Sequence, residues 1–245
     1  MIRTANPALN PDIFRLRSGA SSTGLMTLQG TVNKTMVLLL LVISSAAFTW
    51  INFMHQNMGL VAGLGIIGAI VGLGVGIATA LKQEWAPVTA PIYAAAQGLF
   101  LGGLSAGIET QYPGIVMQAV GMTFGTLFCL LGAYKSGLIK ATENFKLGIV
   151  AATGGIMVVY LVAMVLGFFG IPFLQGSGLI SIGFSLFVVT IAALNLVLDF
   201  DFIEQGAQSG APKHMEWYGA FGLMVTLIWL YVEILRLLAK LRERD

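Results

Sequence analysis

Four carboxylates lie in or beside apolar stretches of this sequence. Asp199, Asp201 and Glu204 fall within six positions at the end of a long apolar run. Glu233 lies well inside the last apolar run, in the segment TLIWLYVEILRLLAK. A charged side chain inside a membrane helix costs about 2.5–3.5 kcal/mol on insertion scales, so such residues usually have a function. Carboxylates in that setting can exchange protons or bind cations that prefer oxygen ligands.

Helical spacing divides the first three acids between two faces of a helix. Asn195 lies one turn before Asp199 on the same face, where it can donate a hydrogen bond to the Asp199 carboxylate. Asp201 shares a different face with Glu204. We therefore expect Asp199 to point into the protein and the other two acids to form the hydrated end of the helix. The alternative for Asp199 is a solvated helix end.

Asp199 and Glu233 belong to consecutive apolar runs that are expected to form an antiparallel hairpin. Their midpoint is position 216, whereas the predicted turn, Gly206–Pro212, centres near 209. The mismatch of several residues is on the order of 10 Å, which a bent segment at Lys213–Trp217 could absorb. Pairing of the two acids is therefore permitted but not required. The alternative for Glu233 is a local ion pair with Arg236, three residues further on.

The elements that carry these residues are transmembrane helices. The chain is 57% hydrophobic and only 10% charged, whereas soluble domains carry about 25% charged residues; its mean hydropathy is +0.86. An apolar run of about 20 residues is long enough to cross a bilayer. The predicted fold is an all-α integral membrane protein whose spans are Thr35–Phe53, Gly59–Leu81, Ala90–Ile108, Gly114–Tyr134, Leu147–Phe169, Gly178–Leu198 and Tyr218–Leu238.

A polar segment precedes the first span. We predict residues 1–30 to be an N-terminal tail and residues 31–245 to be a single seven-helix transmembrane domain. Lys and Arg are concentrated in the tail and in alternate loops, which favours a cytoplasmic N-terminus. Seven spans then place the C-terminus outside, although the basic residues Arg242 and Arg244 follow the last span.

Other classes of function are disfavoured. The net charge of +2 and the lack of a basic cluster argue against nucleic acid as a partner. His55 and His214 lie in separate loops and the single cysteine, Cys129, lies in an apolar run, so we expect no zinc-type site and no cofactor. No motif supplies a nucleophile with a base, so we do not expect an enzyme.

Glycines recur within the predicted spans at intervals of four residues. The pattern GLGIIG at positions 63–68 matches a dinucleotide-binding fingerprint, but no strand precedes it. Small residues at this spacing instead allow transmembrane helices to approach closely. We predict close packing of the second, third and fourth spans through Gly68, Gly72, Gly76, Gly98, Gly102, Gly121 and Gly125.

Three segments resemble a bacterial branch of the Bax-inhibitor-like transmembrane family, also called the YccA-like family. They are MTLQGTVNKTMVLLLLVISSAAFTW, PVTAPIYAAAQGLFLGGLSAGIE, and LDFDFIEQGA followed by WYGAFGLMVTLIWLYVEILRLLAKLRER. The resemblance covers roughly residues 25 to 245. It implies six helices around a central seventh, located in the bacterial inner membrane. It also implies a pH-sensitive calcium leak channel, gated by an acidic pair between helices six and seven.

The resemblance assigns the gate to particular residues. The family's motif of Asp followed four positions later by Ile falls on Asp199 and Ile203, and its Leu-Tyr-x-Asp motif ends on Glu233. Glu thus replaces the usual Asp, and the loop between the two acids is longer than in better-studied relatives. Asp199 and Glu233 are expected to share a proton and to bind the transported calcium transiently. The supporting polar residues are Asn195, Asp201, Glu204 and Arg236.

A second function is also implied by the resemblance. The protein would then be an interaction protein that modulates a membrane-bound protease or another membrane complex without conducting ions. The polar tail before residue 31 would be the docking segment.

Overall fold

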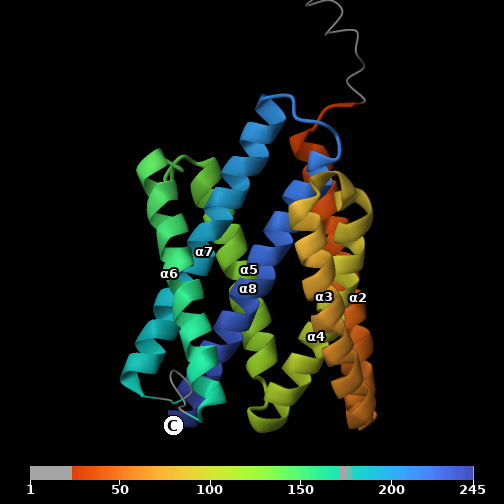
Figure 1. Ribbon diagram of the computed structural model, residues 1–245, viewed down its shortest axis with the longest axis vertical. Helices are drawn as coiled ribbons and strands as arrows, with labels where there is room; N and C mark the ends of the chain where they lie inside the picture. Colours follow the sequence, from red (N-terminus) through yellow and green to blue (C-terminus); the bar gives the residue numbers. More distant parts are fainter. Residues whose placement is uncertain (1–23, 171–175, 177, 245) are drawn as a thin grey trace, which may run out of the picture.

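The computed structural model describes residues 24–170, 176 and 178–244, and this part of the chain is a bundle of long helices (Figure 1). A short 3-10 turn, η3 (Gln83–Trp85), precedes the third of them. In chain order the helices are α2 (Leu28–Met54), α3 (Met58–Leu81), α4 (Ala86–Gln111), α5 (Ile115–Lys135), α6 (Glu143–Phe168), α7 (Leu179–Gln208) and α8 (Met215–Arg244).

All seven helices are long and apolar enough to cross a membrane. Each predicted span coincides with one helix, so the predicted seven-helix membrane fold is confirmed. The largest extension is in α7, which continues as a helix through the acidic segment to Gln208. Two acids in this last part of α7 are bonded to side chains of α5 and α6, as described below.

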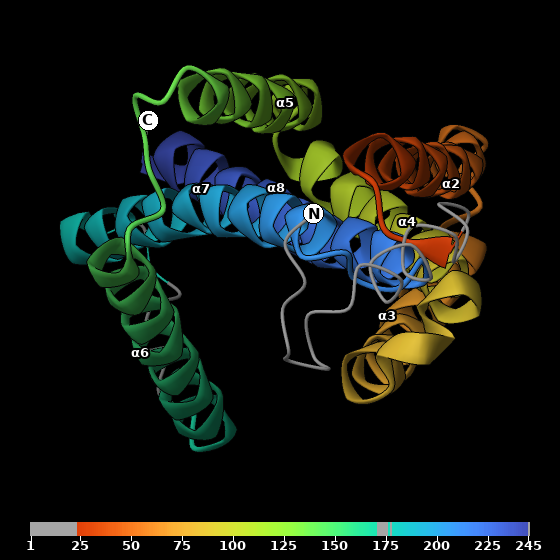
Figure 2. The same cartoon turned by 90° about the horizontal axis from the view of Figure 1, so that it is seen from above.

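The last helix, α8, is the centre of the bundle. Its spanning segment is 67% buried inside the protein, the largest share of the seven. Helices α2, α4, α5 and α7 pack directly against it, whereas α3 packs mainly on α4 and α6 mainly on α7 (Figure 2). Residues on α8 are therefore the ones most removed from lipid, and the expected central position of the last helix is confirmed.

Glycines make the closest helix contacts in one half of the bundle. A Cβ atom on Gly68 would lie 2.4 Å from a backbone oxygen of α4, and one on Gly98 would lie 2.3 Å from a backbone oxygen of α2. The predicted close packing is confirmed at these contacts. At Gly121 and Gly125 a Cβ would meet no described atom within 4 Å. The prediction is wrong for these two glycines because α5 packs mainly on α8 and α7.

Replacing Gly68 with alanine is expected to destabilise the bundle by about 1–3 kcal/mol, the usual effect of overpacking. The added methyl would press on backbone atoms of α4, which cannot rotate away as a side chain can. Gly74→Ala is the matched control, because a Cβ there meets no described atom within 4 Å. Thermal unfolding in detergent should give a lower midpoint for Gly68→Ala alone. Equal midpoints for the two variants would contradict the packing argument.

The chain before α2 is docked onto the loop between α7 and α8. The backbone N–H of Met26 donates to the carbonyl of Ala211 at 2.7 Å, and the N–H of Lys213 donates to the carbonyl of Gly24 at 2.9 Å. Leu25 and Pro212 form an isolated antiparallel bridge within these contacts. Residues 24–30, which we predicted to belong to the polar tail, are thus docked on the bundle or already part of α2. The rest of that predicted tail lies outside the described residues.

The first described residues and the end of α8 lie at opposite ends of the bundle (Figure 1). If the charge asymmetry of the loops sets the orientation, the N-terminal end faces the cytoplasm. A reporter fused after Asp245 is then expected to give an external signal. A cytoplasmic signal from that fusion would show that the orientation is reversed.

Candidate functional site

Asp199 lies at the interface between α7 and α8. Its Oδ2 atom is buried and has no hydrogen-bond partner in the described part of the chain. On α8 it faces the hydroxyl of Thr226 and Gly222, where a Cβ atom would lie 3.9 Å from Oδ1. Burying a polar oxygen without a partner is costly, and more so when it is charged. The packed state of α7 and α8 is therefore suited to a neutral carboxyl at this position.

The amide of Asn195 does not reach Asp199. Its nitrogen donates one hydrogen bond to the Thr153 hydroxyl of α6 and one to the Ile191 carbonyl, each at 2.9 Å. Both N–H groups of the amide are thereby used. Asn195 consequently joins α7 to α6, and the hydrogen bond that helical spacing permitted is not formed.

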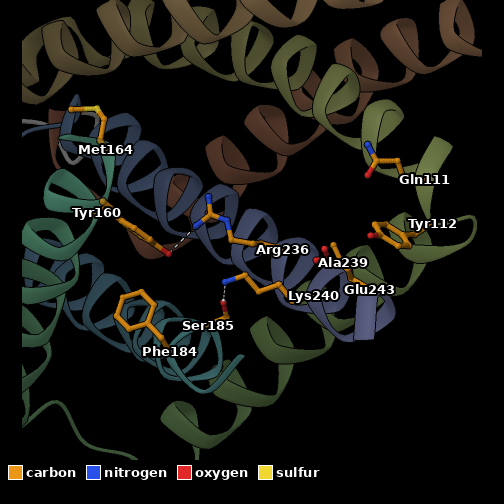
Figure 3. Close-up of a pocket in the computed structure, with 11 residues that line it drawn as sticks. Gln111, Tyr112, Tyr160, Met164, Phe184, Ser185, Arg236, Ala239, Lys240 and Glu243 are labelled. Carbon is orange, nitrogen blue, oxygen red and sulfur yellow. Dashed lines mark hydrogen bonds between the residues drawn. The ribbon is translucent and has the colours of Figure 1, made fainter. Parts of the chain in front are cut away.

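Glu233 is held by a separate group of side chains. Its carboxylate is 2% exposed and accepts hydrogen bonds from the Tyr160 hydroxyl of α6 at 3.0 and 2.9 Å. Arg236 donates to the same carboxylate at 3.1 Å and to the Tyr160 oxygen at 2.8 Å (Figure 3). The local ion pair between Glu233 and Arg236 is thus formed, and Tyr160 connects it to α6.

The structure does not bring Asp199 and Glu233 together. Asp199 lies opposite Thr226, and Glu233 is seven residues further along α8. Seven helical residues correspond to about 10 Å along the axis. The loop between α7 and α8 does not compensate for the axial offset between the two acids that the sequence indicated. The two acids occupy different levels of the bundle in this conformation.

Asp201 and Glu204, which were expected at the hydrated end of the helix, are also bonded to other side chains. The Asp201 carboxylate pairs with the Lys146 ammonium of α6 at 2.9 Å, and Glu204 accepts a hydrogen bond from the Tyr134 hydroxyl of α5. Each acid is also bonded to the glutamine one turn further on in α7. These contacts join the end of α7 to two neighbouring helices.

Sequence reasoning missed Glu216, which is completely buried at the start of α8. Its carboxylate accepts bonds from the Thr27 N–H at 2.9 Å and the Thr27 hydroxyl at 2.8 Å. It also pairs with Lys213 at 2.9 Å and with Lys34. We call Thr27, Lys34, Lys213 and Glu216 the Glu216 cluster. It fastens the beginning of α2 to the beginning of α8.

The Glu216 cluster depends on a glycine. A Cβ atom at Gly30 would lie 2.1 Å from the Glu216 Oε1 atom, so a side chain at that position would displace the carboxylate. Thr27 also caps α2, since its hydroxyl accepts the N–H of Gly30 at 2.9 Å. The only sign of this site in the sequence was that Glu216 is a single acid between a loop rich in helix breakers and the apolar run of α8.

Lys240 was also missed. It follows the last predicted span, where a lysine is normally solvated, but it is only 7% exposed. Its ammonium donates to the Ser181 hydroxyl at 2.7 Å and to the Ser185 hydroxyl at 2.8 Å (Figure 3). The two serines lie four residues apart near the start of α7, and this spacing was the signal available in the sequence.

Within residues 24–170, 176 and 178–244, no three His, Cys, Asp or Glu side chains are grouped so as to hold a metal ion.

Comparison with known proteins gives one match. The sequence profile of a family described as Bax inhibitor 1 like matches residues 6–243, which is nearly the whole chain. No curated protein and no solved structure was found to match it.

Proposed function

Because this chain belongs to the Bax inhibitor 1 like family, we propose that it is a pH-sensitive calcium leak channel with the Asp199 carboxyl as its gate. The chain is a multi-pass membrane protein by its seven spans. The bacterial inner membrane, with the N-terminus in the cytoplasm, is its proposed location. The ion and the pH response are carried over from the family resemblance.

The observation that supports this gate most directly is the unpaired oxygen of Asp199. A carboxyl inside a membrane bundle is a functional candidate by default, and no Lys, Arg or His of the residues described pairs with this one. Losing its proton would place an unpaired negative charge between α7 and α8. That charge is relieved if the helices separate and admit water or a cation. Rising pH is therefore proposed to open the leak, and falling pH to close it.

Glu233 has a different role in this proposal from the one that the family resemblance suggests. Its carboxylate is already neutralised by Arg236 and bonded to Tyr160, so it does not share a proton with Asp199 in the packed state. It offers a second oxygen site about 10 Å further along α8. A cation that passed Asp199 would reach Glu233 next, provided that the Arg236 pair opened. Two weak sites in series suit a leak, since tight binding would prevent release.

The direct test is calcium flux into liposomes that contain only this protein, at several values between about pH 5 and pH 8. We expect flux to rise with pH in protein-containing liposomes and to stay at background in empty ones. Absence of flux at every pH, from protein shown to be folded, would reject the channel. The interaction protein suggested by the family resemblance would then be the better description.

A further inference from the structure

A second polar site lies at the opposite end of α8 from the Glu216 cluster. It is a cavity of about 480 Å³ between α4, α6, α7 and α8. Figure 3 shows that Arg236 and Lys240 of α8 extend toward Tyr160 and Ser185 on the facing helices. The calcium pathway proposed above reaches one wall of this cavity, where Arg236 and Tyr160 hold Glu233, but it does not use Lys240.

Lys240 is a buried cation that is surrounded by neutral acceptors. Two of its N–H groups donate to Ser181 and Ser185 hydroxyls, and the third has only a 3.5 Å contact with the Ser181 carbonyl. No Asp or Glu among the described residues lies within ion-pair distance of it. Burying an ammonium without an opposite charge is unfavourable. Within the described part of the chain, Lys240 therefore has no directly paired counter-charge.

Arg236 is a second cation at this cavity, and some of its N–H groups are not used in its bonds to Glu233 and Tyr160. Its hydrogen bonds to Glu233 and Tyr160 all use one guanidinium nitrogen, Nη1. The side chain is 44% exposed, so its other N–H groups are accessible from the cavity. The lining contains two cations, Arg236 and Lys240, and one acid, Glu243; the Arg236 charge is balanced by Glu233 beside the cavity, which leaves the Lys240 charge as the excess in its inner part. Glu243 is exposed on the last turn of α8, so the inner part of the cavity is positive.

The position of the cavity relative to the bilayer suits a phosphate group. Helix α8 has 30 residues, which makes it about 45 Å long, whereas the hydrocarbon core of a bilayer is about 30 Å thick. Lys240 is four residues from the end of this helix. It therefore lies near the boundary between hydrocarbon and headgroups, where lipid phosphates are abundant.

We propose that this cavity binds a phosphate anion, held by the Lys240 ammonium and the free N–H groups of Arg236. A guanidinium and an ammonium are the usual partners of phosphate oxygens, and Ser185 supplies a hydroxyl beside them. The phosphate can come from a lipid headgroup or from free phosphate, since both present the same oxygens. The bound anion supplies the charge that Lys240 lacks.

The test is to titrate the full-length protein in neutral detergent with sodium phosphate and, separately, with dihexanoyl phosphatidylglycerol. Saturable binding of at least one probe is expected, measured as a concentration-dependent rise in the unfolding midpoint. Lys240→Met should weaken that binding about tenfold or more, the effect of losing one charge-assisted hydrogen bond. Lys135→Met, which removes an exposed lysine at the other end of the bundle, should leave it unchanged. Sodium chloride at matched ionic strength controls for screening.

The two probes distinguish the sources of the phosphate. Binding of the lipid alone assigns the site to a headgroup, whereas binding of inorganic phosphate as well assigns it to phosphate in general. If Lys240→Met does not fold, Arg236→Gln serves instead, because that side chain is partly exposed and its loss disturbs packing less. The proposal is overturned if wild-type protein binds neither probe, or if the folded variant binds as tightly as wild type.

Discussion

Asp199→Asn protein is expected to leak calcium slowly at every pH, at the rate that the wild type shows at the acidic end of its range. Asparagine has the shape of the neutral carboxyl, so the packing of Gly222 and Thr226 against it is retained. It cannot ionise, however, and the charge that separates α7 from α8 never forms. At the alkaline end the variant should conduct at least about tenfold less than wild type, a barrier change of about 1.4 kcal/mol.

Asp201→Asn is the matched control, because the same substitution is made two residues away. The Asp201 carboxylate faces Lys146 and remains paired at the surface of the bundle. Its replacement should alter the rate only modestly and leave the pH at half-maximal flux in place. A wild-type pH profile in Asp199→Asn liposomes would eliminate Asp199 as the gate.

The Glu233→Gln variant distinguishes a gate formed by Asp199 alone from a gate formed by Asp199 and Glu233 together. If the two acids shared a proton, either amide would flatten the pH profile. With the two acids at levels about 10 Å apart along α8, Glu233→Gln should change the maximal flux and keep the pH response. Flattening by both variants would show that Asp199 and Glu233 meet in a conformation other than the one described.

The second large effect is expected at Glu216. Glu216→Ala should lower stability by about 3 kcal/mol, the lower end of the range for breaking a buried ion pair. The lower end applies because Lys34 and Lys213 keep some access to water. The variant also leaves the N–H of Thr27 without its acceptor. The unfolding midpoint should fall, and hydrogen exchange at Thr27 should become faster.

Glu84→Ala provides the comparison for this substitution. Glu84 lies in η3 and is exposed, so its removal should leave the unfolding midpoint within error of wild type. An equal fall for Glu84→Ala and Glu216→Ala would mean that the Glu216 cluster contributes no specific stability.

The spans could be predicted because each is a run of about 20 apolar residues, and such a run is sufficient to define a transmembrane helix. The contacts made by the end of α7 could not be predicted, since their partners Lys146 and Tyr134 belong to other helices. The separation of Asp199 from Glu233 was indicated by the position of the turn. Only the structure shows that the turn does not compensate for it.

The two missed residues share a physical reason. Charges near the ends of spans are normally solvated, so Glu216 and Lys240 gave no sign of burial. Lys34 lies 182 residues before Glu216, and Ser181 lies 59 residues before Lys240. Periodicity within one helix carries no information about partners at such distances. Burial of these two charges follows from tertiary packing alone.

The Glu216 cluster also sets the order in which the protein can be completed during synthesis. Lys34 and Thr27 are made first, but their acceptor is translated 182 and 189 residues later. At 5–20 residues per second, the ribosome takes about 10 to 40 s to cover that distance. Throughout this interval the start of α2 lacks the bonds of the Glu216 cluster, although the rest of the helix can already pack on α4. The start of α2 is thus among the last parts of the bundle to be secured.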